Sequence, residues 1–343
     1  MMQLENAYKV STIGLKCYLE STNEDMLQCV NEHDKKKKLY SITKDDEKFR
    51  NEIKLEKENE VTSETPVERA KRVKLIAKKL LQKNMKKTWE GKPLHGQFVK
   101  RTTKPNISQG LTHRWLKSAG LKSETEGFLI AAQDQSLPTR NYQRHISKTI
   151  ADDKCRMCKV KPETIDHLIA GCPMIAATEY LERHDKIGRY LHWKICSATG
   201  FETKSKWYEH QPEPVKENDK FCLLWDFSIN TDRTIRANRP DIIVKDKEKK
   251  ECLLIDMSVP GDSNVAAKEF EKKSKYKDLE IEIQRMWRMR TRVIPVVVGA
   301  LGVITKDFEA LIKEIPGNVD GKEIQKVALL GTAHILRKTL SIK

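Results

Sequence analysis

The sequence has no long apolar segment, and we expect no export signal. Its longest apolar run, residues 293–304, spans only twelve residues and includes Pro295, whereas a helix that crosses a bilayer needs about 20. Residues 1–20 contain Glu5 and Lys9 and lack the continuous apolar core of a signal peptide. We therefore expect a soluble protein without a membrane partner or export, in which residues 293–304 form a buried strand and turn.

Acidic residues are scarce in one stretch of a basic chain. The 343 residues include 65 Lys and Arg against 49 Asp and Glu, a formal net charge of +16. Residues 66–122 contain 16 lysines and arginines but only two acids, Glu68 and Glu90, which leaves a net charge of +14 in this stretch. A local excess of this kind favours contacts with phosphates. A solvated helix face with ordinary lysines is the alternative interpretation.

The cysteines fit a metal site better than a disulfide framework. There are eight, and three of them lie close to one histidine, which fits a reducing compartment and a metal site. The other five are predicted to be core thiols: Cys17, Cys29, Cys196, Cys222 and Cys252.

Cys155, Cys158, His167 and Cys172 follow the spacing Cys-x2-Cys-x8-His-x4-Cys. The first two thiols can sit on a tight turn, while the His and the last Cys face the metal from a short helical turn and its end. Four such ligands complete a tetrahedral zinc shell and leave no open position, so the zinc would be structural. The alternative is a set of buried thiols beside a core histidine.

The first part of the chain is predicted to be helical. Residues 1–30 read as a helical piece and residues 31–64 as an exposed, charged linker. A helix should begin at Thr65 and Pro66, because Thr can cap it and Glu68 can close a capping box. Basic side chains that could lie along a phosphate backbone follow on this helix and beyond it: Lys71, Arg72, Lys78, Lys79, Arg101 and Arg114.

Residues 176–196 form a second candidate surface for nucleic acid. Apolar residues alternate there with basic ones at helical spacing. The alternative is that these charges only solvate a helix packed on the zinc cluster. The basic residues are Arg183, His184, Lys186, Arg189, His192 and Lys194.

The last third of the chain changes to short β-rich runs, which predicts an α+β fold with a sheet. The runs are 221–227, 241–244, 252–259 and 293–298. Asp241 opens the second run and Asp256 closes an apolar stretch in the third, so a hairpin would bring the two carboxylates together at one end of the sheet. Such a pair can bind a hard cation such as Mg²⁺, which activates water and stabilises the charge on a cleaved phosphodiester.

A helix is predicted to follow, with Lys268, Lys272 and Lys275 on one face. One of these lysines could point toward the two carboxylates. Spacing alone does not choose among the three.

Taken together, the motifs resemble the C-terminal end of certain site-specific non-LTR retrotransposon polyproteins, which carry a restriction-like endonuclease. The resemblance runs from about Leu4 to Leu340. It depends on the order of the basic helices, the Cys-Cys-His-Cys cluster and the Arg-Pro-Asp…Asp…Lys pattern. The segments that carry it are 92–98, 155–172, 225–227, 239–241 and 296–302.

The resemblance implies roles for individual residues. The four Cys and His ligands would bind zinc, while Asp241 and Asp256 would hold magnesium in a PD-(D/E)xK-type core. Lys272 would be the displaced catalytic lysine, because the usual lysine position, two residues after the second acid, is Ser258. Lys268 and Lys275 compete with Lys272 for this role.

The resemblance also implies a domain order and partners. Residues 1–64 would be a helical segment with a linker, 65–148 a basic region like a polymerase thumb and connection, 149–200 the zinc cluster with a helix, and 201–343 the endonuclease. We expect a nuclear protein that binds DNA, with the element's RNA as a second partner and a reverse transcriptase acting in trans, because no polymerase core is evident. The alternative is an inactive zinc-, DNA- or RNA-binding remnant.

Overall fold

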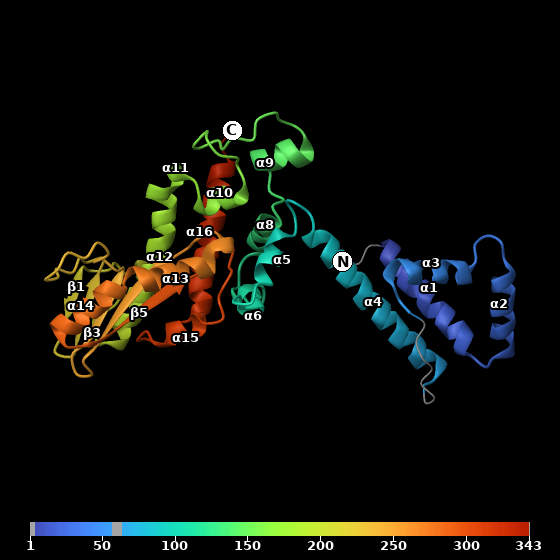
Figure 1. Ribbon diagram of the computed structural model, residues 1–343, viewed down its shortest axis with the longest axis horizontal. Coiled ribbons are helices and arrows are strands. Elements are labelled where there is room, and N and C mark those ends of the chain that lie inside the picture. Colours follow the sequence, from blue (N-terminus) through green and yellow to red (C-terminus); the bar gives the residue numbers. More distant parts are fainter. Residues whose placement is uncertain (1–3, 57–63, 343) are drawn as a thin grey trace. The chain divides into compact units, whose positions relative to one another are not determined.

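The computed structural model describes residues 4–56 and 64–342. The chain divides into two compact units, Met1–Lys92 and Pro93–Lys343 (Figure 1). The fold is mixed α+β, with helices in both units and one five-stranded sheet in the second. Among the described residues, no helix is long and apolar enough to cross a membrane.

The first unit is a group of helices around a small apolar core. Ile13, Phe49 and Val73 come from three different helices and meet in this core. The helix boundaries are α1 (Leu4–Ser21), α2 (Asp25–Lys36), α3 (Ile42–Ile53) and α4 (Pro66–Glu90).

The expected linker is wrong for residues 31–56. These residues form the end of α2, the helix α3 and the segment after it, and Phe49, Ile53 and Leu55 are buried in the core. The Asp34 carboxylate fixes the start of α3, because it accepts hydrogen bonds from the backbone N–H groups of Ile42 (2.9 Å) and Thr43 (2.8 Å). The apolar residues of α3 are separated by charged residues, so its sequence shows no clear apolar face. Residues 57–63 lie outside the described part of the chain.

Helix α4 begins as the sequence predicts. The Thr65 side chain accepts a hydrogen bond from the Glu68 N–H, and the Glu68 carboxylate accepts one from the Thr65 N–H at 3.0 Å. This capping box satisfies N–H groups that the first turn leaves unpaired. Helix α4 belongs to the first unit, so the contacts divide the chain at residue 92 rather than at residue 64.

The second unit contains a sheet in the order β1-β2-β3-β4-β5. Strands β1 to β4 are antiparallel neighbours, and β5 runs parallel to β4 after a crossover through two helices. The four longer strands confirm the predicted runs, whereas β1 was not predicted. Their boundaries are β1 (Val215–Glu217), β2 (Phe221–Trp225), β3 (Ile242–Asp246), β4 (Glu251–Ser258) and β5 (Arg290–Val297).

Helices cover both faces of this sheet. Alternate residues of β4, Ile255 and Met257, pack on one side with Leu191 of α12 (Leu181–Ala198) and with helices near the C-terminus. Leu254 packs on the opposite side with Tyr276 and with α14. The helices involved are α13 (Val265–Lys275), α14 (Lys277–Trp287), α15 (Phe308–Lys313) and α16 (Gly321–Leu340).

Helix α12 approaches the sheet closely at Gly188. A Cβ atom at this position would lie 2.4 Å from a Trp225 ring atom and 2.7 Å from Met257 Cε. Glycine is therefore required for the helix to lie this close. The consequence is that side chains on α12 can reach the ends of β3 and β4.

Short helices precede the sheet, and Trp115 in one of them is almost fully buried. Five of the seven, all except those at 109–113 and 140–142, contribute buried residues to one core that also contains Cys155, Cys172, residues of α16 and the turn after β5. The boundaries of the seven helices are α5 (Gln97–Thr102), α6 (Gln109–His113), α7 (Trp115–Ser118), α8 (Ser123–Gln133), α9 (Arg140–Tyr142), α10 (Ile165–Ala170) and α11 (Pro173–Ile175).

Candidate functional site

The structure brings Cys155, Cys158, His167 and Cys172 together. One ligand atom from each lies within 4.8 Å of the others. The Sγ atoms of Cys155 and Cys172 are 4.0 Å apart, and Cys158 Sγ lies 3.4 Å from His167 Nε2. A tetrahedral zinc shell separates its ligand atoms by about 3.3–3.8 Å, so this four-ligand cluster could hold a metal such as zinc with little movement.

Local backbone structure positions these ligands. The Cys155 N–H donates to the Lys161 carbonyl and the Lys159 N–H donates to the Cys155 carbonyl, both at 2.8 Å, which closes the turn between the first two cysteines. Thr164 caps α10 by accepting from the His167 N–H at 3.1 Å. Cys172 follows the end of α10, as predicted.

The ligands of the cluster differ in how burial affects their protonation. Burial lowers the pKa of His167, which keeps the imidazole neutral. Burial opposes ionisation of Cys158, but the backbone N–H groups of Lys161 and Val160 lower its pKa overall. Burial raises the pKa of Cys172 to about 11. Binding a metal there would require release of the Cys172 proton.

Asp241 and Asp256 lie at the same end of the sheet. Ile242 of β3 pairs with Ile255 of β4, so extending this antiparallel register places the two aspartates opposite each other. Asp256 is only 2% exposed. The Met257 N–H donates to Asp241 Oδ2 at 2.6 Å, which joins the first carboxylate to the second strand.

Lys272 and Tyr276, one helical turn apart, both reach Asp256. The ammonium of Lys272 contacts Asp256 Oδ2, and the Tyr276 hydroxyl donates to Asp256 Oδ1 at 2.7 Å. Apart from the Lys272 contact, Asp256 Oδ2 has no hydrogen-bond partner among the described residues. Burial and the neighbouring Asp241 raise the pKa of Asp256, against the opposing effect of Lys272. We call Asp241, Asp256 and Lys272 the Asp–Lys site.

His184 of α12 completes the surroundings of Asp241. Its Nε2 atom lies 3.2 Å from Asp241 Oδ2, and its Nδ1 atom lies 3.1 Å from Asp185 Oδ1. Burial favours the neutral ring, but the hydrogen bond to Asp241 prevails and the pKa of His184 rises to about 9. Burial opposes ionisation of Asp241, but His184 lowers its pKa overall. The pair is therefore ionised near neutral pH.

The three candidate lysines of α13 differ in what they contact. Lys268 pairs with Glu271 at 2.7 Å, on the exposed part of the helix. Lys275 lies 2.8 Å from the Tyr276 hydroxyl and so reaches Asp256 only through that residue. Lys272 contacts the carboxylate directly. Ser258, at the usual lysine position, ends β4.

Three basic residues predicted to bind nucleic acid are engaged within the protein. The prediction is wrong for Arg183, which is 3% exposed and donates to Thr332 Oγ1, to the Ile169 carbonyl and to the Val259 carbonyl. Arg101 forms a two-point ion pair with Asp166. Arg114 pairs with Glu309.

The other residues predicted to contact nucleic acid differ in their exposure. Lys71, Lys78 and Lys79 are exposed on α4 and form no ion pair within the described part of the chain. Arg72 pairs with Glu64 at 2.8 Å. Arg189 is half-buried. Nucleic-acid binding by these residues stays a prediction.

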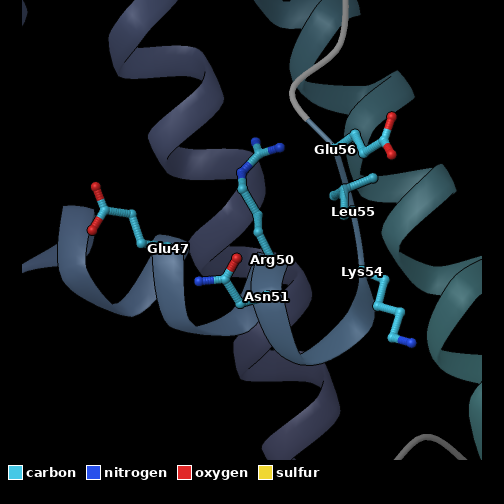
Figure 2. A pocket seen from close by; sticks show the side chains of 6 residues that line it. All are labelled: Glu47, Arg50, Asn51, Lys54, Leu55 and Glu56. Carbon is cyan, nitrogen blue, oxygen red and sulfur yellow. The ribbon is translucent and has the colours of Figure 1, made fainter.

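A hollow of about 470 Å³ in the first unit has no catalytic arrangement of side chains. Figure 2 shows that its lining comes from α3 and the segment just after it. Two acidic and two basic side chains line it, so their charges balance, as is common on a solvated surface. The lining residues are Glu47, Arg50, Asn51, Lys54, Leu55 and Glu56.

Comparison with protein-family models found no matching family, and comparison with curated proteins found no relative.

The sequence analysis assigned no role to two residues that contact the carboxylates of the Asp–Lys site, Tyr276 and His184. Tyr276 could have been found, because it lies four residues after Lys272 and shares its helix face. His184 carried no such signal. The sequence placed it on a basic surface, and only the packing of α12 on the sheet brings it to Asp241.

Proposed function

We propose that this protein is a metal-dependent DNA endonuclease whose second unit has a restriction-endonuclease-like core stabilised by zinc. The observation that carries the proposal is the convergence of Asp241, Asp256 and Lys272 from two strands and a helix. Perturbed, partly buried charges of this kind are typical of functional sites. The antiparallel strands followed by a crossover to a parallel strand agree with such a core.

The residues present fit a magnesium ion. Asp256 Oδ2 is buried, and the Lys272 ammonium is its one polar contact among the described residues; Asp241 is the second carboxylate at the same strand end. Hard cations prefer such oxygens. When bound, magnesium would lower the pKa of a water molecule and stabilise charge on a phosphoryl oxygen.

The protein's own side chains have distinct roles in this proposal. Asp241 and Asp256 bind the ion. Tyr276 orients Asp256 through its hydrogen bond, and His184 orients Asp241. Lys272 balances the charge of Asp256 in the free protein and would turn its ammonium toward the scissile phosphate when DNA is bound. Exposed lysines of α4 would contact the DNA backbone.

One observation favours a second function, an inactive zinc- and nucleic-acid-binding protein derived from a retroelement. Ser258 occupies the usual lysine position, and Lys272 is already paired with Asp256. Such a protein would retain zinc and DNA binding but would not cut DNA.

The Asp241→Ala variant tests the proposal. We expect it to lose magnesium-dependent nicking of supercoiled DNA and to retain DNA binding, since the α4 lysines are unchanged. Equal nicking by the variant and the parent would contradict the assignment. Absence of nicking by the parent, with zinc and DNA binding intact, would instead support the inactive protein.

A further inference from the structure

A second group of metal-ligating side chains lies on α12, away from both sites described above. His192, Cys196 and His210 place three ligand atoms within 4.8 Å of one another. His192 and Cys196 are both 0% exposed and His210 is 4% exposed. The sequence predicted His192 to be on a basic surface and Cys196 to be a core thiol. The prediction is wrong for His192, because the loop after α12 covers it.

We infer that His192 Nδ1, Cys196 Sγ and His210 Nε2 bind a second zinc ion, with water in the fourth position. His192 and Cys196 are four residues apart on one helix, so both face the same point. His210 is delivered by the loop that follows the 3-10 turn η3 (Trp207–Glu209). One thiolate and two imidazoles are ligands that zinc accepts.

The distances fit this ion after a small adjustment. Cys196 Sγ lies 3.5 Å from His192 Nδ1, already within the span of about 3.3–3.8 Å for tetrahedral zinc ligands. His192 Nδ1 and His210 Nε2 are 2.7 Å apart. The two rings would move apart by about 0.6 Å to admit the ion. His210 belongs to a loop, which allows this movement.

A cavity of about 370 Å³ lies beside His210. Its lining carries three acids and two lysines: Glu202, Glu209, Glu213, Lys204 and Lys216. Lys216 pairs with Glu213 at 2.6 Å. His192 and Cys196 do not line this cavity, so an ion would enter past His210.

The metal would hold the loop between α12 and β1 against α12. The loop also contacts the helix through the hydrogen bond from Trp193 Nε1 to the Lys204 carbonyl at 2.8 Å and through the rings of Tyr190 and Trp207, so the ion would add to these contacts. His192 also packs edge-on against Trp225, which ends β2. The bound ion would therefore support the same helix that brings His184 to Asp241.

Metal analysis of the purified full chain tests the inference. We expect two zinc ions per chain in the parent, one in His210→Gln, one in Cys196→Ser and one in Cys158→Ser, which removes a ligand of the four-ligand cluster. A matched control, Cys222→Ser, changes a buried thiol outside both clusters and should keep two. One zinc in the parent, or two in both His210→Gln and Cys196→Ser, would overturn the proposal.

Cobalt titration of the parent chain gives a second measurement that does not depend on variants folding. Thiolate-to-cobalt charge-transfer absorption scales with the number of thiolates bound. The site with one cysteine should contribute about a third of the intensity of the site with three. A titration that ends at one equivalent of cobalt would contradict the second site, because the His and Cys side chains would then form only a hydrogen-bonded core cluster.

Discussion

The four-ligand cluster and the Asp–Lys site differ in how far apart in the sequence their residues lie. The first gathers four uncharged or soft ligands from residues 155–172, within one short segment. The second joins Asp256 of β4, Lys272 of α13 and Asp241 at the start of β3, and each carboxylate has a partner from another element. Local spacing therefore defines the first site, whereas tertiary packing defines the second.

The difference also separates stability from activity. A filled tetrahedral shell has no position for substrate, so a metal there would stabilise the fold. Burying a carboxylate costs desolvation energy. Lys272 and Tyr276 offset this cost at Asp256, and His184 offsets it at Asp241. We expect variants of the first site to lower the stability of the fold and variants of the second to remove activity.

The largest effect is expected at the four-ligand cluster. Cys172→Ser should lower the free energy of unfolding by about 4 kcal/mol or more, because metal binding contributes directly to folding. Urea unfolding of the zinc-loaded protein measures this. Cys222→Ser is the control and should keep its zinc. If Cys172→Ser loses no more stability than the control, the four residues are an ordinary core cluster.

The next effect concerns the choice among the α13 lysines. Lys272→Met should reduce nicking by about 100-fold, because it removes a charge from the reacting centre. Lys268→Met should leave the rate within about twofold, since Lys268 pairs with Glu271 away from the site. Plasmid nicking under identical conditions compares them. Loss of activity in Lys268→Met alone would reverse the assignment.

A smaller effect is expected in the pH dependence of stability. The pKa of His184 is raised to about 9 in the folded protein, above its ordinary value of about 6.5. Its stabilising effect is therefore complete below about pH 6.5 and is lost as the pH rises through about 9, by about 3 kcal/mol. His184→Gln should lack this loss between pH 6.5 and 9. Denaturant unfolding at several pH values measures it, and an identical loss in the variant would show that another group causes it.

The smallest effect is expected for the exposed lysines of α4. The double variant Lys78→Ala/Lys79→Ala should reduce the slope of log affinity against log salt by about 1–2, because two phosphate contacts are lost. Lys35→Ala is the control, since Lys35 pairs with Glu32. DNA-binding titrations at several salt concentrations provide the slopes. An unchanged slope would place the DNA on another surface.

Much of the fold could be read from the sequence, because local signals agree with the final structure. The capping box predicted the start of α4, and β-rich runs predicted four of the five strands. The core of α3 could not be read in this way, since Phe49 and Ile53 stand alone among charged residues. Strand β1 has only three residues and little apolar character.

The sites were predictable to different degrees. The Cys-x2-Cys-x8-His-x4-Cys spacing is local, so all four ligands could be named. The choice of Lys272 over Lys268 and Lys275 required the rotation of α13 about its axis, which sequence spacing leaves open. The burial of Arg183 and His192 depends on what covers α12, and no local pattern encodes that.

Nicking of supercoiled plasmid tests the central claim most directly. The parent protein and the Asp241→Asn/Asp256→Asn variant would be compared in magnesium and in a magnesium-free control, with zinc content and DNA binding measured on the same preparations. The account predicts nicking only by the parent and only with magnesium, by at least about 1000-fold over the variant. Equal nicking by both proteins, or none by a zinc-loaded parent that binds DNA, would contradict it.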